Sequence, residues 1–188
     1  MIGDPARFVG KTLLDLGCRT GKMAAYFASL GARVDGFDIN AGSVRQAEME
    51  ADRWRVTANF CVFSGALEDL PSCRYDFIFT KSVLVLFPDL DSALAQISRV
   101  LKPEGQYIAV ENLRGGPFIA ALRTLTGRGK NYRFQLLDRD FRLLFMNYFR
   151  SIEAVTRFNL VAGVKAARQL QRHPNREPSA SGAVRGVP

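Results

Sequence analysis

The first forty residues alternate between short apolar runs and mixed polar segments. Thr12–Leu16 is an apolar run that predicts a strand, and a turn with Gly17 and Gly21 and then a helix follow it. A second apolar run, Ala32–Phe37, predicts another strand, and the acid Asp38 comes directly after it. A strand, a glycine turn, a helix and a second strand in this order make half of a nucleotide-binding α/β unit.

The same alternation continues toward the C-terminus, so we expect an α/β fold throughout. Tyr75–Thr80 is almost continuously apolar, as a strand buried on both faces of a parallel sheet should be. The other expected elements are helices at Ala41–Ala51, Leu90–Leu101 and Asp138–Tyr148, and strands at Val56–Phe63, within 101–112, at Phe149–Thr156 and at Phe158–Ala166.

The turn after the first strand carries the first candidate chemistry. Gly17 has no Cβ and lets the backbone approach a ligand, and the helix after Gly21 offers its N-terminus to polar groups. Asp38 is placed to accept hydrogen bonds from both hydroxyls of a ribose. The turn lacks the G-x-G-x-x-G spacing of dinucleotide sites, and NAD therefore stays only an alternative ligand.

This segment resembles the first motif of class I S-adenosylmethionine-dependent methyltransferases, which is an acid, one residue and then G-x-G-x-G. Asp15, Gly17 and Gly21 match the motif, and Asp38 matches the family's ribose-binding acid. Arg19 stands where the middle glycine is usual, and a positive φ there costs about 1 kcal/mol. The resemblance implies S-adenosylmethionine as cofactor and a three-layer Rossmann-like α/β sandwich. Its seven-strand sheet would be mostly parallel, with an antiparallel last strand.

A second family motif, G-D-A-x-x-L-P, follows the third strand, and its acid receives the adenine amino group. Aligned on the L-P pair, Ala66 takes the place of that acid, while the backbone at Leu67 keeps the means to contact the adenine edge. Glu68 and Asp69 are either substitutes for the acid or solvated turn residues. The cofactor-binding residues that the resemblance implies are Asp15, Gly17, Cys18, Arg19, Gly21, Asp38, Ile39, Ala66, Leu67 and Lys81.

The catalytic residues stay unassigned. Ligands in such folds lie beyond the carboxyl ends of the strands, so Thr80, Lys81 and Ser82 should border the reaction site. Val83–Leu86 lacks the histidine of the V-L-E-H segment that many relatives have. A sulfonium methyl group is a strong electrophile, so in-line presentation of the acceptor supplies much of the rate. A general base is optional and depends on the pKa of the acceptor. Lys81 and Glu111 are candidate bases, and Glu111 is equally well a structural acid paired with an arginine farther along the chain.

The positive charge of the chain, +8, lies mostly in its C-terminal third. We expect a methyltransferase domain over 1–167, with 113–136 as a substrate lid, and a disordered basic tail over 168–188. A basic lid favours an anionic acceptor or is only a solvated surface. RNA is the less favoured acceptor, because no appended RNA-binding module is visible. The basic residues of the lid are Arg114, Arg123, Arg128, Lys130 and Arg133.

Composition narrows the classes of protein further. A chain of 188 residues is long enough for one domain, and no apolar run reaches the roughly 18 residues that a membrane span needs. The N-terminus has no apolar signal-peptide core, so a cytoplasmic setting is expected. Cys18, Cys61 and Cys73 share no metal-ligand spacing, and we expect no metal site. Cys18 is expected to serve as a small apolar residue in the turn.

The sequence therefore predicts a methyltransferase that moves the methyl group of S-adenosylmethionine to an oxygen or nitrogen of a small molecule. Two other readings stay open. Arg19 and Ala66 both depart from the cofactor motifs, which leaves a non-catalytic methyltransferase-like partner protein as an alternative. The other alternative is an RNA-directed methyltransferase. The sequence indicates no oligomeric state.

Overall fold

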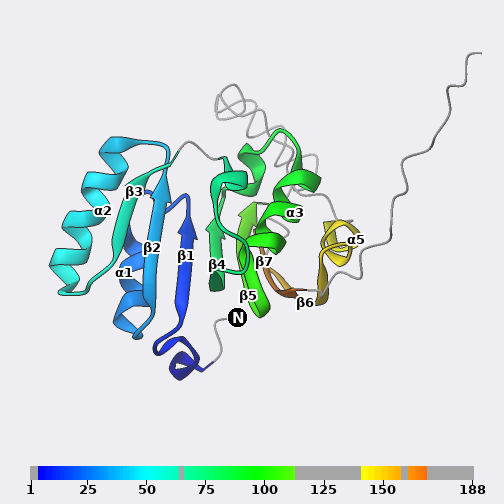
Figure 1. Cartoon of the computed structure of the whole chain (residues 1–188), viewed down its shortest axis with the longest axis horizontal. Coiled ribbons are helices and arrows are strands. Elements are labelled where there is room, and N and C mark those ends of the chain that lie inside the picture. Colours follow the sequence, from blue (N-terminus) through cyan, green and yellow to red (C-terminus); the bar gives the residue numbers. More distant parts are fainter. Residues whose placement is uncertain (1–3, 64–65, 113–140, 158–160, 169–188) are drawn as a thin grey trace, which may run out of the picture.

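A computed structural model describes residues 4–63, 66–112, 141–157 and 161–168 of the chain (Figure 1). The predicted lid, 113–136, lies outside the described residues, and so does the predicted tail from residue 169 onward. In the part of the chain that the structure describes, no helix is both long enough and apolar enough to cross a membrane.

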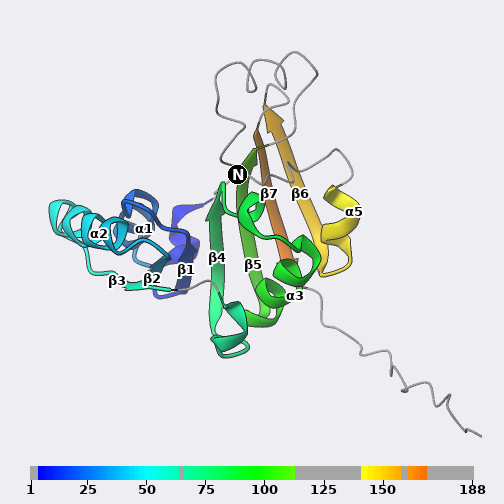
Figure 2. The same cartoon turned by 90° about the horizontal axis from the view of Figure 1, so that it is seen from above.

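One sheet runs through the part of the molecule that the structure describes (Figures 1 and 2). The strands β1 to β5 pair in parallel, and β7 pairs antiparallel with both β5 and β6. The prediction of a Rossmann-like α/β fold with a parallel sheet is confirmed. Across the sheet the order is β3 (Asn59–Val62), β2 (Arg33–Asp38), β1 (Thr12–Leu16), β4 (Tyr75–Lys81), β5 (Leu101–Asn112), β7 (Val161–Arg168) and β6 (Phe149–Arg157).

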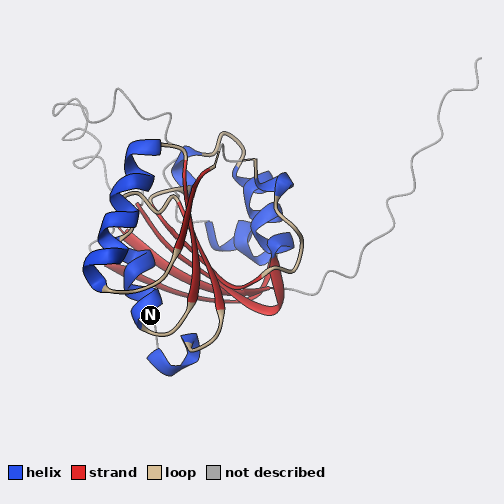
Figure 3. Ribbon diagram, turned by 60° about the vertical axis from the view of Figure 1, so that its left-hand side comes forward, coloured by secondary structure: helices blue, strands red, loops and turns tan. Residues whose placement is uncertain are grey.

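Helices cover both faces of the sheet (Figure 3). Successive residues of a strand point to opposite faces. Leu13 of β1 accordingly packs with Phe27 of α1 in one apolar cluster, and Leu14 packs with Leu94 of α3 in the other. The helices are α1 (Lys22–Ser29), α2 (Ala41–Trp54), α3 (Leu90–Val100) and α5 (Phe141–Met146), and the 3₁₀ turns are η1 (Pro5–Phe8), η2 (Leu67–Asp69) and η3 (Leu84–Leu86).

Side-chain caps explain where two of the helices begin. Asn40 caps α2 by accepting a hydrogen bond from the backbone N–H of Ser43 at 3.0 Å. Asp89 caps α3 through the backbone N–H groups of Asp91 and Ser92. Gly21, at the start of α1, has no side chain and therefore supplies no such cap.

Some predicted bounds are wrong, and backbone geometry explains the differences. The third strand is Asn59–Val62 instead of Val56–Phe63, because the left-handed residue Arg55 ends α2 and Val56 N–H still bonds to the Ala51 carbonyl. Asp38 is the last residue of β2 and does not lie past it. The acid therefore sits at the carboxyl edge of the sheet, where ligands of such folds bind.

Candidate functional site

The turn between β1 and α1 is held against β2 by backbone hydrogen bonds. The N–H groups of Gly17 and Cys18 both donate to the Phe37 carbonyl, at 2.7 and 2.9 Å, and Gly21 N–H donates to the Cys18 carbonyl. Gly17, Arg19 and Gly21 have φ values of 74°, 51° and 73°. This left-handed region costs a non-glycine residue about 1–2 kcal/mol. Arg19 therefore needs stabilising contacts from neighbouring residues to keep this conformation.

The two glycines of this turn are needed for packing within the chain itself. A Cβ on Gly17 would collide with Cγ2 of Val83, from the segment after β4. A Cβ on Gly21 would lie 2.7 Å from Cα of Ala47 in α2. The sequence predicts that Gly17 lets the backbone approach a ligand, and in the structure the Val83 side chain lies where a Cβ on Gly17 would be. The glycines therefore bring the turn, the β4 end and α2 close together.

Asp38 connects this turn to the start of α2. Its Oδ2 accepts the Arg19 N–H and its Oδ1 accepts the Asn40 N–H, each at 2.9 Å. The bond to Arg19 offsets part of the strain of a non-glycine residue at φ 51°. Asp38 itself is half-buried, and Ile39 beside it is 72% exposed. The carboxylate stands at an open edge of the sheet, and each of its oxygens can accept a further donor.

Asp15 is a buried carboxyl group below the turn. It is 2% exposed, and its Oδ2 has no hydrogen-bond partner in the described part of the chain. Burial raises the pKa of Asp15 to about 7; the Ala24 amide opposes the rise, the charge of Asp38 adds to it, and Lys81 lowers it. A buried oxygen without a partner is costly, and Oε2 of Glu111 is buried in the same way in the described residues.

The thiol of Cys18 stays protonated at neutral pH. Burial raises its pKa to about 12, and the charges of Asp15 and Asp38 act in the same direction. A thiol of this kind is a poor nucleophile. Cys18 therefore fits the small apolar residue that the sequence suggested. Within the described residues, no cluster of histidine, cysteine or acidic side chains could hold a metal ion.

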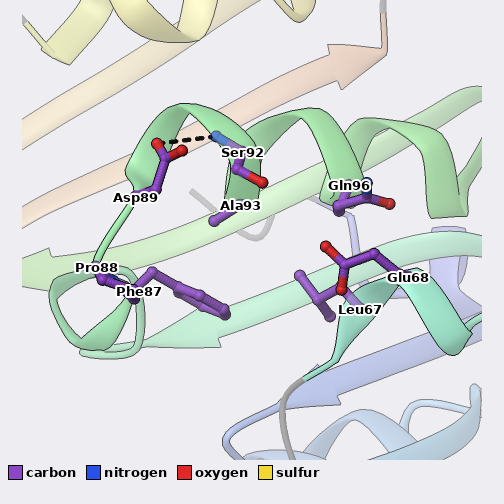
Figure 4. Close-up of a pocket in the computed structure, with 8 residues that line it drawn as sticks. All are labelled: Leu67, Glu68, Phe87, Pro88, Asp89, Ser92, Ala93 and Gln96. Atoms are coloured by element: carbon purple, nitrogen blue, oxygen red, sulfur yellow. Dashed lines mark hydrogen bonds between the residues drawn. The ribbon is translucent and has the colours of Figure 1, made fainter.

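Near the predicted adenine edge, the structure has a pocket of about 260 Å³ (Figure 4). Leu67, Phe87 and Ala93 give it an apolar lining, while Glu68 and Asp89 add carboxylates. Asp89 already caps α3, as the dashed line in Figure 4 shows. The lining comes from η2, the segment before α3 and α3 itself, and consists of Leu67, Glu68, Phe87, Pro88, Asp89, Ser92, Ala93 and Gln96.

The predicted residues of η2 divide between the surface and the interior. Ala66 is half-buried and Leu67 is buried, and the Leu67 carbonyl accepts a hydrogen bond from Arg99 of α3 at 2.8 Å. Glu68 and Asp69 are exposed. Arg99 thus ties η2 to α3 and fixes the backbone at Leu67.

Glu111, at the end of β5, is a buried acceptor of three hydrogen bonds. Its Oε1 accepts from Thr80 Oγ1 at 3.0 Å, Val83 N–H at 3.1 Å and Leu84 N–H at 3.3 Å, and Thr80 also bonds to the Tyr107 hydroxyl. Burial raises the pKa of Glu111 to about 7 against the lowering by these donors. Its side chain is 0% exposed, so it does not meet solvent as a free base would.

Sequence reasoning missed two contacts of this site. Thr80 of β4 bonds to both Tyr107 and Glu111 of β5, and Val83 packs on Gly17. The alternation of side chains along β5 could have indicated that Tyr107 and Glu111 lie near each other, because they are an even number of residues apart and lie on one face of the sheet. The predicted pairing of Glu111 with an arginine of the lid lies outside the described residues. Lys81, the other candidate base, is exposed.

Comparison with known proteins gives one match to a family and several to individual relatives. Residues 14–109 match the model of a family described as a methyltransferase domain. The chain is 36% identical over 106 residues to the S-adenosyl-L-methionine-dependent Diels-Alderase iccD of Talaromyces variabilis, covering 54% of this chain and 36% of that protein. It is 30% identical over 98 residues to the ubiquinone biosynthesis O-methyltransferase of Bradyrhizobium sp. (strain ORS 278), covering 51% and 38%. The chain thus spans less than half the length of these two curated relatives.

Solved structures share the fold at lower identity. The PH0226 protein from Pyrococcus horikoshii OT3 superposes with a TM-score of 0.69 at 18% identity, over 85% of this chain and 84% of that one. The magnesium protoporphyrin IX methyltransferase from Synechocystis PCC 6803, with bound SAH, gives 0.64 at 23% identity, over 86% and 76%. At these identities the likeness concerns the fold.

Proposed function

Because the chain belongs to the family of class I S-adenosylmethionine-dependent methyltransferases, we propose that it binds this cofactor at the β1–α1 turn and transfers its methyl group to an oxygen or nitrogen of a small molecule. The observation that carries the proposal is Asp38, a half-buried carboxylate at the end of β2 with acceptor capacity left on both oxygens. A carboxylate at the end of the second strand can accept hydrogen bonds from both hydroxyls of a ribose.

The described residues fit the proposed cofactor. Asp38 is the proposed partner of the ribose hydroxyls, and the exposed Ile39 offers an apolar surface to the adenine. Ionised Asp15 would add negative charge beneath the turn, which favours a ligand with a positive centre. The backbone at Ala66 and Leu67 is proposed to meet the adenine edge. The remaining residues that we propose to contact the cofactor lie in the β1–α1 turn or at the end of β4, namely Gly17, Cys18, Arg19, Gly21 and Lys81.

The proposed mechanism relies on position more than on proton transfer. When bound, S-adenosylmethionine supplies an electrophilic methyl group on a sulfonium. The chain's contribution is to fix the turn through Asp38 and the β4 end through Glu111, which restricts the reacting groups to one geometry. The described site has no histidine. Oε1 of Glu111 accepts from three donors, and its Oε2 is buried with no hydrogen-bond partner in the described residues. This arrangement suits an acceptor that is already nucleophilic or loses its proton to water.

The same site supports a second candidate function, in which the cofactor is bound but not consumed. The relative with 36% identity is named as a Diels-Alderase that depends on S-adenosylmethionine. A cycloaddition needs binding and orientation but no general base, which agrees with the described side chains. The lid over 113–136 and an anionic acceptor stay proposals in either case.

Two measurements on the same protein separate these functions. Calorimetric titration with S-adenosylmethionine, S-adenosylhomocysteine and NADH tests which cofactor binds. Incubation with S-adenosylmethionine and a panel of phenols, carboxylates, amines and RNA, followed by mass spectrometry, detects S-adenosylhomocysteine and a methylated product. Formation of both supports methyl transfer, and the product identifies the acceptor class. Binding without turnover of any acceptor favours cyclisation or the partner-protein reading, and absence of binding up to about millimolar cofactor refutes the cofactor site.

A further inference from the structure

Four hydrogen bonds join Thr80 of β4 and the segment that follows β4 to the end of β5. Ser82 N–H donates to the Val110 carbonyl at 2.9 Å. Val83 N–H, Leu84 N–H and the Thr80 hydroxyl all donate to Oε1 of Glu111. Three of the four bonds therefore depend on one carboxylate oxygen, and two of them hold the backbone just before and at the start of η3.

Val83 connects this segment to the β1–α1 turn, where we propose that the cofactor binds. The Val83 side chain fills the space beside Gly17 where any other residue would have a Cβ. Valine has a stiff χ1, so its methyl groups follow the position of its backbone. A shift of the Val83 backbone would consequently open a gap beside Gly17 and remove the packing that supports the left-handed turn.

We propose that Glu111 is a positioning residue of the cofactor site, which acts by holding the Val83 backbone so that the Val83 side chain supports the Gly17 turn. The inference rests on the proposed function, because it assumes that the turn receives the cofactor. Glu111 acts through Val83 and touches no reacting group in this arrangement. It needs an acceptor oxygen at the Oε1 position, and the negative charge is secondary.

Two other roles for Glu111 make different predictions. A general base would need an ionisable group, so Glu111→Gln would abolish turnover and leave cofactor binding intact. A group that only stabilises the fold would lower the melting temperature when replaced, without changing the cofactor affinity of the folded protein. The positioning role instead predicts that affinity follows the presence of an acceptor oxygen.

The test is a double-mutant cycle on the full chain, with the dissociation constant of S-adenosylhomocysteine measured by calorimetry. The variants are Glu111→Leu, Glu111→Gln, Val83→Ala and Glu111→Leu with Val83→Ala. Leucine has a similar size but no acceptor, whereas the glutamine carbonyl can replace Oε1. Glu104→Gln is the matched control, because Glu104 lies on the same strand, is exposed and pairs with Arg150.

We expect Glu111→Leu to weaken binding about 10-fold, because backbone N–H groups that lose their buried acceptor cost free energy of that order. Glu111→Gln should stay within about 3-fold of wild type, and Glu104→Gln should not change. Because both residues act on the same contact, the double variant should bind no more weakly than Glu111→Leu alone.

Three outcomes overturn the proposal. These are wild-type affinity in folded Glu111→Leu, equal losses in the leucine and glutamine variants, or losses at Glu111 and Val83 that multiply. If Glu111→Leu does not fold, Val83→Ala decides alone: it should weaken binding at least about 3-fold, and unchanged affinity refutes the role. If the wild-type protein does not bind S-adenosylhomocysteine, the proposed function itself is refuted. This outcome differs from a change seen only in the Glu111 or Val83 variants.

Discussion

Gly21 gives the sharpest prediction about how the cofactor turn is built. Its φ is 73°, and a Cβ placed on it would lie 2.7 Å from both Cα and Cβ of Ala47 and 3.0 Å from the Ala47 carbonyl oxygen. Two of these three neighbours are backbone atoms of α2. They can move away only if the whole helix shifts against α1, so Gly21→Ala should disturb the packing of the two helices.

The magnitude follows from two separate costs. The left-handed backbone costs an alanine about 1–2 kcal/mol. Overpacking against a rigid neighbour adds about 1–3 kcal/mol. We expect Gly21→Ala to lower the free energy of unfolding by about 2–5 kcal/mol in total. Gly10 is the matched control, because its φ is 69° and nothing lies within 4 Å of its built Cβ.

Urea denaturation of the wild type, Gly10→Ala and Gly21→Ala measures both costs. Gly10→Ala should lose only the backbone part, about 1–2 kcal/mol. Any gain from a stiffer unfolded chain is common to both variants and cancels in their difference. The m-values should stay equal, so that midpoints report stability. Equal destabilisation by the two variants would refute the argument that α2 packs on Gly21.

Two further predictions concern charge and strain around the same turn. Arg19→Gly should raise stability by up to about 1 kcal/mol, because it relieves a φ of 51° while the backbone bond to Asp38 remains. Cofactor affinity measured by calorimetry should stay the same or improve. A clear drop in affinity would instead show that the Arg19 side chain, and not only its backbone, contacts the cofactor. Asp15 and Glu111 both have pKa values raised from ordinary values of 3.8 and 4.5 to about 7. The folded protein binds these protons more tightly than the unfolded chain does, so their stabilisation is complete below about pH 4 and is lost as the pH rises through about 7. Denaturation between about pH 5 and pH 8 should show this loss, and Asp15→Asn should reduce it; an unchanged pH dependence in Asp15→Asn would contradict the assignment.

Local patterns were sufficient for most of the fold. The apolar runs at Thr12–Leu16 and Tyr75–Thr80 are strands within a residue of the predicted bounds. Their alternation also places Leu13 and Leu14 on opposite faces, as the two apolar clusters show. The third strand was predicted too long, because nothing local indicates that β2 offers partners to only four of its residues.

The contacts among the candidate site residues could not be predicted from the sequence. Asp15, Gly17 and Asp38 could be found from the motif alone. The packing of Val83 on Gly17 joins residues far apart in the sequence, and a valine after a strand carries no sign of that contact. Glu111 could be found as a polar residue at the end of an apolar strand, but its role depends on backbone amides from another loop.

The central claim is that Asp38 holds the ribose of S-adenosylmethionine. The most direct test is calorimetric titration of S-adenosylhomocysteine into the wild type, Asp38→Ala and Asp35→Asn. Asp35 is the control, since it lies three residues earlier on β2 and binds Arg74, Tyr75 and Asn59. We predict that the wild type and Asp35→Asn bind alike. Asp38→Ala should bind about 10- to 150-fold more weakly, which corresponds to about 1.5–3 kcal/mol of hydrogen bonding to a charged group. Equal affinity in Asp38→Ala and the wild type, or no binding by the wild type, would contradict the account.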